Sequence, residues 1–161
     1  LEELQNVILY FKIAVIYFGS EKYNKSVHLM NLIQDKEHVL HIRPDMESAI
    51  QIFHLVAHFE KGNRDLLPYL SKSAYSRMRK EKNLYRFENI LLDFFGSRIH
   101  QAHSQKDIVE QFKHLKKELL PLTNNQYEKV PMQEFDFISW VESKIENRSF
   151  AEVLREKAKL H

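Results

Sequence analysis

The chain has 161 residues, 43% of them hydrophobic and 29% charged, and a formal net charge of +2 with neutral histidines. This composition predicts a folded domain with a sizeable core, and the small net charge gives no sign of nucleic acid or an anionic membrane as partner. Only 3 Gly and 4 Pro are present, which disfavours a turn-rich all-β fold. The absence of cysteine excludes disulfides and thiolate metal sites, and it fits a reducing compartment, so we expect a cytoplasmic protein.

Apolar residues recur at helical spacing along most of the chain, which predicts an all-α protein of about eight helices. The predicted helices cover about residues 1–18, 23–34, 44–61, 63–78, 84–95, 106–119, 132–146 and a short segment from 149 onward. Pro44 is expected to open the third helix, and Gly62 to end it in a left-handed conformation. Asn63 is expected to cap the fourth helix, and Ser149 with Glu152 forms a capping-box pattern before the last.

The longest apolar run, Val7 to Phe18, is interrupted by Lys12 and is too short to span a bilayer. We therefore expect no membrane partner. The chain begins with Leu1 rather than Met, which leads us to expect a segment of a longer protein. The loop at 121–130 is the strongest internal break, so we predict a helical-repeat domain at 1–121 and C-terminal capping helices at 122–161 within the same compact unit.

The helix–break–helix pattern recurs when the sequence is shifted by 41 residues. The segment 13–18 (IAVIYF) then lies over 54–59 (HLVAHF), and 21–23 lies over 62–64. A period of this length is typical of stacked helical hairpins, each of which needs its neighbours to bury its second face. No clean third copy follows residue 80.

The first copy resembles a tetratricopeptide repeat. The match consists of Tyr10, Ile13-Ala14 and Tyr17, followed by Glu21-Lys22-Tyr23, Ser26, Met30 and Ile33. Ala14 and Ser26 stand where that family has small residues for close helix approach, and Glu21 replaces its usual turn glycine. In the second copy Leu55 and Leu67 replace the small residues. The resemblance implies antiparallel hairpins stacked in a short right-handed α-solenoid.

Two further stretches, Ile50 to Phe95 and Phe135 to Lys157, resemble the C-terminal part of a group of tetratricopeptide-like proteins from the Bacteroidetes. The resemblance implies no biochemical activity. It adds the expectation of a bacterial scaffold-type protein.

In the resembled family the first helix of each hairpin lines a concave groove. The matching positions are Phe11, Val15, Phe18, Ile52, Val56 and Phe59, all of which are apolar. Such a groove would bind an amphipathic helix or an apolar peptide. The other interpretation is that the C-terminal helices, with Phe137 and Trp140, cover it. The expected partner is a protein or peptide, or upstream repeats of the same chain, and a homodimer is left open.

A basic stretch at 77–86 gives the alternative function, a nucleic-acid-associated regulator. Its candidate residues are Arg77, Arg79, Lys80, Lys82 and Arg86, with Tyr75 and Tyr85 available for base stacking. A solvated helix end would have the same composition, because basic residues are favoured at helix C-termini.

No catalytic signature is present. His54 and His58 share a helix face, but they are two residues where a zinc site needs three or four ligands. His100, His103 and His114 form a loose second group, interpreted as part of a solvated loop or as cations favoured near a helix end. Glu88 and Asp93 are interpreted as residues of a solvated helix face. No nucleophile motif or phosphate-binding loop occurs. The sequence therefore predicts a non-enzymatic interaction module with no cofactor and no metal.

Overall fold

A computed structural model describes residues 1–82 and 84–160, and for Glu37 the backbone alone. Over these residues the chain is helical and contains no strand, which confirms the predicted all-α class. The α-helices are α1 Glu2–Gly19, α2 Tyr23–Gln34, α3 Glu37–Leu40, α4 Pro44–Lys61, α5 Leu67–Lys80, α6 Arg86–Gly96, α7 Gln105–Leu119, α8 Val130–Glu134, α9 Phe137–Glu146 and α10 Phe150–Ala158. Short 3₁₀ turns at Arg64–Leu66, Arg98–Gln101 and Leu120–Asn124 join some of them.

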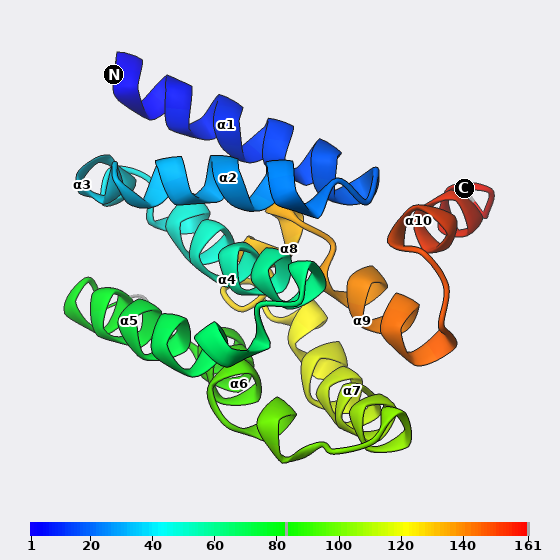
Figure 1. Ribbon diagram of the computed structural model, residues 1–161. Coiled ribbons are helices and arrows are strands. Elements are labelled where there is room, and N and C mark those ends of the chain that lie inside the picture. Colours follow the sequence, from blue (N-terminus) through cyan, green and yellow to red (C-terminus); the bar gives the residue numbers. More distant parts are fainter. Residues whose placement is uncertain (83, 161) are drawn as a thin grey trace.

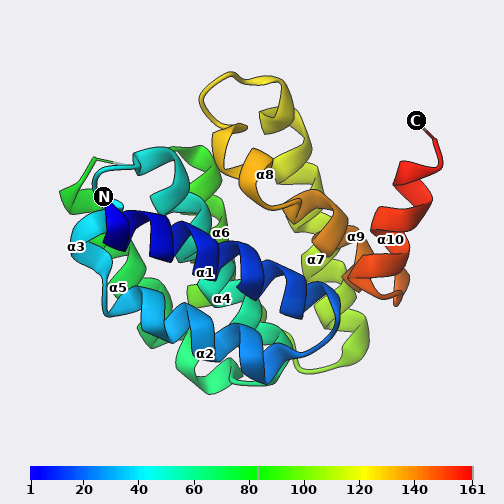
Figure 2. The same cartoon turned by 90° about the horizontal axis from the view of Figure 1, so that it is seen from above.

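The longer helices pack against one another in chain order. α1 packs on α2, α2 on α4, α4 on α5, α5 on α6, α6 on α7, α7 on α9 and α9 on α10 (Figure 1). The short α8 breaks this order, because it returns to pack on α4. Viewed from above, the chain returns after α7 so that α8 lies towards α1 and α4, and α9 then runs beside α7 to α10 (Figure 2). The segment around α8 therefore packs back on the first two hairpins.

Local signals placed several helix ends correctly. α4 begins at Pro44, and Gly62 ends it at a φ of +95°, a conformation that glycine adopts without a Cβ clash. The expectation that Asn63 caps the next helix is wrong, because its side chain makes no cap bond. The Asn63 amide nitrogen instead lies 3.0 Å from Nδ1 of His58.

The predicted helix at 132–146 is two helices. α8 ends at Glu134, and Phe135 is extended, with φ −149° and ψ 136°. Asp136 then caps α9 by accepting a hydrogen bond from the Ser139 backbone N–H at 2.9 Å. The break turns the chain so that α8 and α9 pack on different helices. The short α3 was not predicted.

Two helix pairs are held close by a serine. In the first hairpin the buried Ser26 Oγ donates to the Ala14 carbonyl at 2.8 Å, across α2 and α1. In the α5–α6 pair Ser71 Oγ donates to the Leu92 carbonyl at 2.6 Å, beside Gly96. Each bond satisfies a buried hydroxyl, and the small residues allow the close approach. Ser26 and Ala14 were predicted to play this role, whereas Ser71 was not.

The core is centred on α4, whose residues from Met46 to His58 are all buried. Phe18 of α1 contacts Phe53 of α4, and Phe135 packs on both, with ring centroids 5.6 Å and 4.9 Å away. The C-terminal segment is therefore part of the same core as the first hairpin. None of the described helices combines the length and hydrophobicity that a bilayer crossing needs.

Candidate functional site

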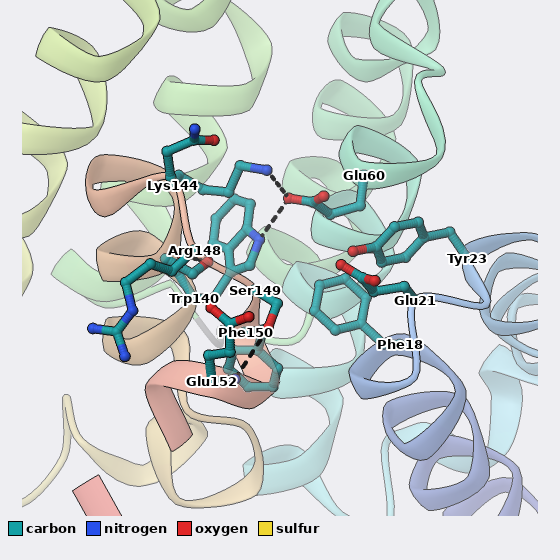
Figure 3. Close-up of a pocket in the computed structure, with 12 residues that line it drawn as sticks. Phe18, Glu21, Tyr23, Glu60, Trp140, Lys144, Arg148, Ser149, Phe150 and Glu152 are labelled. Atoms are coloured by element: carbon teal, nitrogen blue, oxygen red, sulfur yellow. Dashed lines mark hydrogen bonds and ion pairs between the residues drawn. The ribbon is translucent and has the colours of Figure 1, made fainter. Parts of the chain in front are cut away.

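A pocket of about 470 Å³ opens where the first hairpin, the end of α4 and the last hairpin meet (Figure 3). Its lining residues are Phe18 at the end of α1, Glu21 of the following turn and Tyr23 at the start of α2, Glu60 from α4, Trp140, Ser143, Lys144 and Asn147 in and just after α9, and Arg148, Ser149, Phe150 and Glu152 around the start of α10. Volumes of this size are typical of ligand sites.

Three aromatic residues form the apolar part of the pocket. Phe18 and Phe150 contact edge to face, with ring centroids 5.6 Å apart. Trp140 is almost fully buried and packs on Phe59 at 5.9 Å. Phe150 is positioned by the start of α10, where Ser149 Oγ accepts the Glu152 backbone N–H at 3.1 Å. This part of the predicted capping box is confirmed.

Glu60 is the polar centre of the pocket. Its Oε1 accepts a hydrogen bond from Trp140 Nε1 at 3.0 Å and forms an ion pair with Lys144 Nζ at 2.7 Å. Figure 3 shows both interactions from the same carboxylate oxygen. Lys144 also lies over the Phe59 ring, 5.8 Å from its centroid. These contacts connect α4 to α9 and hold the indole at the pocket wall.

Tyr23 faces the same carboxylate. Burial raises the pKa of the Tyr23 hydroxyl above its ordinary value, and the negative charges of Glu60 and Glu21 raise it further. Glu21 has a φ of +60°, which is uncommon for a residue with a Cβ atom. In Figure 3 the Glu21 carboxylate and the Tyr23 hydroxyl point into the same space as Glu60. One wall of the pocket is therefore acidic.

Arg148 belongs to the opposite wall, but its charge is directed elsewhere. The guanidinium points away from Glu60 and Tyr23 in Figure 3. It pairs with Glu156 and, at 3.5 Å, with Glu146. The carboxylates of Glu21 and Glu60 thus face the interior of the pocket. The ammonium group of Lys144 lies there too, and it is paired with Glu60.

The six predicted groove residues do not line an open groove. Phe11, Phe18, Ile52 and Val56 are buried, and Val15 and Phe59 are half-buried against the core. Phe135 and Phe150 cover Phe18, and Trp140 covers Phe59. The open-groove interpretation is wrong, and the covered one, including its use of Trp140, describes this structure. Of the six, only Phe18 lines the pocket.

The basic candidates divide into two kinds. Arg79, Lys80, Lys82 and Arg86 are exposed around the end of α5 and the start of α6, and Asn83 between them lies outside the described residues. Arg77 is half-buried and donates from Nη2 to Gln51 Oε1 at 3.0 Å. Arg77 therefore contacts α4 rather than adding to an exposed basic surface.

His54 and His58 are buried and face each other, with 3.1 Å between their Nε2 atoms. Asn31 Oδ1 of α2 lies 3.1 Å from His54 Nε2. Burial lowers the pKa of His54 to about 3 and also lowers that of His58, and the charges of Arg77 and Lys61 act in the same direction. Among the described residues, no three His, Cys, Asp or Glu side chains are grouped as a metal site.

Glu88 does not lie on a solvated face as interpreted from the sequence, although Asp93 is exposed. It is buried, accepts a hydrogen bond from Ser48 Oγ at 2.7 Å, and burial raises its pKa. Nearby, Glu128 accepts the backbone N–H groups of Arg86 at 3.0 Å and Phe87 at 2.8 Å. A carboxylate from a distant loop thus caps α6, where the helix dipole favours a negative charge.

The pocket could not be located from the sequence, because Tyr23, Glu60 and Lys144 are separated by long stretches of chain. The turn signal at 19–22 and the Ser149 cap were visible, but their proximity was not. Comparison with known family models, with curated proteins and with solved structures finds no match to this chain.

Proposed function

We propose that this chain is a non-enzymatic interaction module of the helical-repeat type, arranged as a short right-handed α-solenoid, which binds a peptide segment of a partner protein. The proposed binding site is the pocket between the first and last hairpins. The observation that carries this proposal is the acidic wall of Glu21, Tyr23 and Glu60 above a small floor formed by the edges of Phe18, Trp140 and Phe150.

The repeat architecture is supported by the likeness of α1 and α4, which are the first helices of two successive hairpins. α1 and α4 each have 18 residues, and each is followed by a short turn and a second helix. The chain-order packing of the helices fits hairpins stacked on one another. The serine-mediated approach of α1 and α2 lies at the position where the resembled family has small residues.

A peptide is the favoured ligand because the pocket presents two chemistries together. The acidic wall favours a basic side chain, and the edges of Phe18, Trp140 and Phe150, which are 1%, 1% and 9% exposed, add a small apolar floor beneath it. The carboxylate of Glu60 already has two partners in the pocket, because it accepts a hydrogen bond from Trp140 and pairs with Lys144. This arrangement suits recognition more than proton transfer.

The test uses Trp140, the only tryptophan in the chain, as a reporter inside the pocket. Peptides from a random displayed 12-residue library are selected on the purified chain and then titrated while the Trp140 emission is recorded. We expect an emission change on binding and at least a tenfold weaker affinity after Glu21→Lys with Glu152→Lys. Both residues are exposed, so the fold is preserved. The matched control is Glu110→Lys on α7, outside the pocket.

Two results would contradict the proposal. One is that the selected peptides bind equally well to the Glu21→Lys, Glu152→Lys variant and leave the Trp140 emission unchanged. The other is tight binding of a fluorescent single-stranded oligonucleotide that weakens steeply with salt and is lost when Arg79, Lys80 and Lys82 are replaced by Glu. That second result would favour the nucleic-acid alternative.

A further inference from the structure

The outer side of α1 exposes a stripe of apolar side chains. Leu9 is 52% exposed and Ile16 66%, the highest values among large aliphatic side chains in the described α-helices. Ile13, half-buried, lies between them on the same face, because the three residues are four and three positions apart. Isolated exposed apolar residues are ordinary, but a continuous stripe along one helix calls for an explanation.

The equivalent stripe of α4 is buried. With the 41-residue offset, Leu9 corresponds to Ile50, Ile13 to His54 and Ile16 to Ala57, which are 0%, 4% and 0% exposed. The inner faces of the two helices do not differ in this way. Phe11 of α1 and Ile52 of α4 are equivalent, and both are buried. The two helices therefore differ in whether the outer side is covered.

α2 is the element that covers this side of α4. The two helices pack together, and Asn31 of α2 reaches His54, the equivalent of Ile13, at 3.1 Å. In Figures 1 and 2 the outer side of α1 has no neighbouring helix in the described chain, whereas α4 lies beneath α2. What α1 lacks is a helix placed as α2 is placed on α4.

We propose that the Leu9–Ile13–Ile16 face of α1 is a docking surface for the second helix of another helical hairpin, presented as α2 is presented to α4. The docking helix would carry apolar residues along its contact face. Opposite Ile13 it would have no amide like that of Asn31, because Ile13 cannot satisfy a buried polar group. This proposal is independent of the peptide pocket, because Leu9, Ile13 and Ile16 are not among the residues that line that pocket.

A hairpin is favoured over a second copy of this chain because of Lys12. The stripe is centred near residues 12 and 13, and Lys12 is exposed beside it. A two-fold axis through the stripe would make an isologous contact and bring the two Lys12 ammonium groups together. Like charges at an interface oppose association. A hairpin helix has no such constraint.

The test extends the chain with its own first hairpin. Residues 1–41 are duplicated in front of Leu1, with Asn31→Leu in the added copy, so that Leu1 takes the place of Ile42 and the added α2 is joined to the original α1 by a connection as long as the one between α2 and α4. Hydroxyl-radical labelling of Leu9 and Ile16 in the original α1 is expected to fall at least fivefold relative to the 161-residue chain. The midpoint of thermal unfolding is expected to rise.

Matched variants separate docking from simple linkage. Leu9→Glu with Ile16→Glu in the original α1 of the extended chain should prevent docking. The labelling of Ile13 in that helix should then return to the level seen in the 161-residue chain. The same pair should leave the stability of the 161-residue chain unchanged, because both side chains are exposed there. A second version with a connection two residues longer guards against a strained junction. Trp140 emission reports the pocket separately and should not change in any of these proteins.

Undiminished labelling of Leu9 and Ile16 in both extended versions would overturn the proposal. So would a dimer of the 161-residue chain, measured by sedimentation, that the Leu9→Glu, Ile16→Glu pair dissociates, since a second copy would then be the occupant.

Discussion

His54 and His58, one turn apart on α4, face each other nitrogen to nitrogen at 3.1 Å and are both buried. Two neutral imidazoles can share this contact only if one donates a hydrogen and the other accepts it. Asn31 from α2 and Asn63 from the α4–α5 turn extend the network at both ends. This chain of polar side chains connects three segments of the first two hairpins.

Acid should therefore destabilise the protein through this pair. The folded-state pKa of His54 is lowered to about 3 and that of His58 is lowered as well, whereas an unfolded histidine titrates near 6.5. Below pH 6.5 the unfolded chain therefore binds more protons than the folded chain, and the free energy of unfolding decreases as the pH is lowered. We expect His54 to lower the free energy of unfolding by up to about 1.4 kcal/mol per pH unit as the pH falls well below 6.5, and the lowered pKa of His58 to add to this loss.

Urea unfolding at pH 7, 6 and 5 measures this slope. His54→Gln with His58→Gln should flatten it, whatever the variant's stability at pH 7, and the exposed His114→Gln should not. A slope equal in the wild type and in the double variant would show that other groups are responsible.

The loop carboxylate of Glu128 should stabilise α6 as an N-cap does. Its two oxygens accept the N–H groups of Arg86 and Phe87, which have no partner within the helix. We expect Glu128→Ala to lower the free energy of unfolding by about 1–2 kcal/mol, within the range of cap deletions. Glu110→Ala, which breaks an exposed pair with Lys113, should cost less than about 0.5 kcal/mol. Faster amide exchange confined to the first turn of α6 would locate the effect, and its absence would contradict the assignment.

A side chain at Gly96 should be destabilising while Ser71 is present. A Cβ atom at Gly96 would lie 3.0 Å from Ser71 Oγ, which is tighter than most real contacts of this kind, and the hydrogen bond of that hydroxyl to the Leu92 carbonyl opposes its displacement. We expect Gly96→Ala to cost about 1–3 kcal/mol, as overpacked sites do. Ser71→Ala removes the crowding oxygen, so the double variant should be more stable than the sum of the single effects predicts.

Gly19 is the matched control for this cycle. A Cβ atom there meets nothing within 4 Å, and its φ is not positive. Gly19→Ala should be neutral or stabilise the protein by up to about 1 kcal/mol. Thermal unfolding of the five proteins completes the measurement. Strictly additive effects of Gly96→Ala and Ser71→Ala would rule out the steric explanation.

Glu60 should determine how Trp140 is held. Glu60→Ala removes the acceptor of the indole N–H and the partner of Lys144. We expect a red-shifted Trp140 emission and a loss of about 1–3 kcal/mol in the free energy of unfolding, the cost of an unpaired buried donor. Glu60→Gln keeps an oxygen acceptor and should preserve the emission maximum. If both variants behave alike, the charge of Glu60 matters and its hydrogen bond does not.

The sequence by itself determined most of the local structure. Pro44 and Gly62 specify the bounds of α4 through their own backbone preferences, and Ser149 starts α10 in the same way. The resemblance to a tetratricopeptide repeat predicted the close approach at Ala14 and Ser26, which lie in adjoining helices joined by a short turn. These features depend on residues within one hairpin, so a single pass along the chain can recognise them.

Only the tertiary structure decided which apolar faces are covered. Phe135, Trp140 and Phe150 cover Phe18 and Phe59, although nothing in the periodicity of α1 or α4 distinguishes a covered face from an open groove. The Glu128 cap and the Glu60–Lys144 pair likewise join residues far apart in the chain. Helical periodicity reports that a face is apolar. What covers it is set by how distant helices pack, and that packing produced the pocket here while α1 kept an exposed outer face.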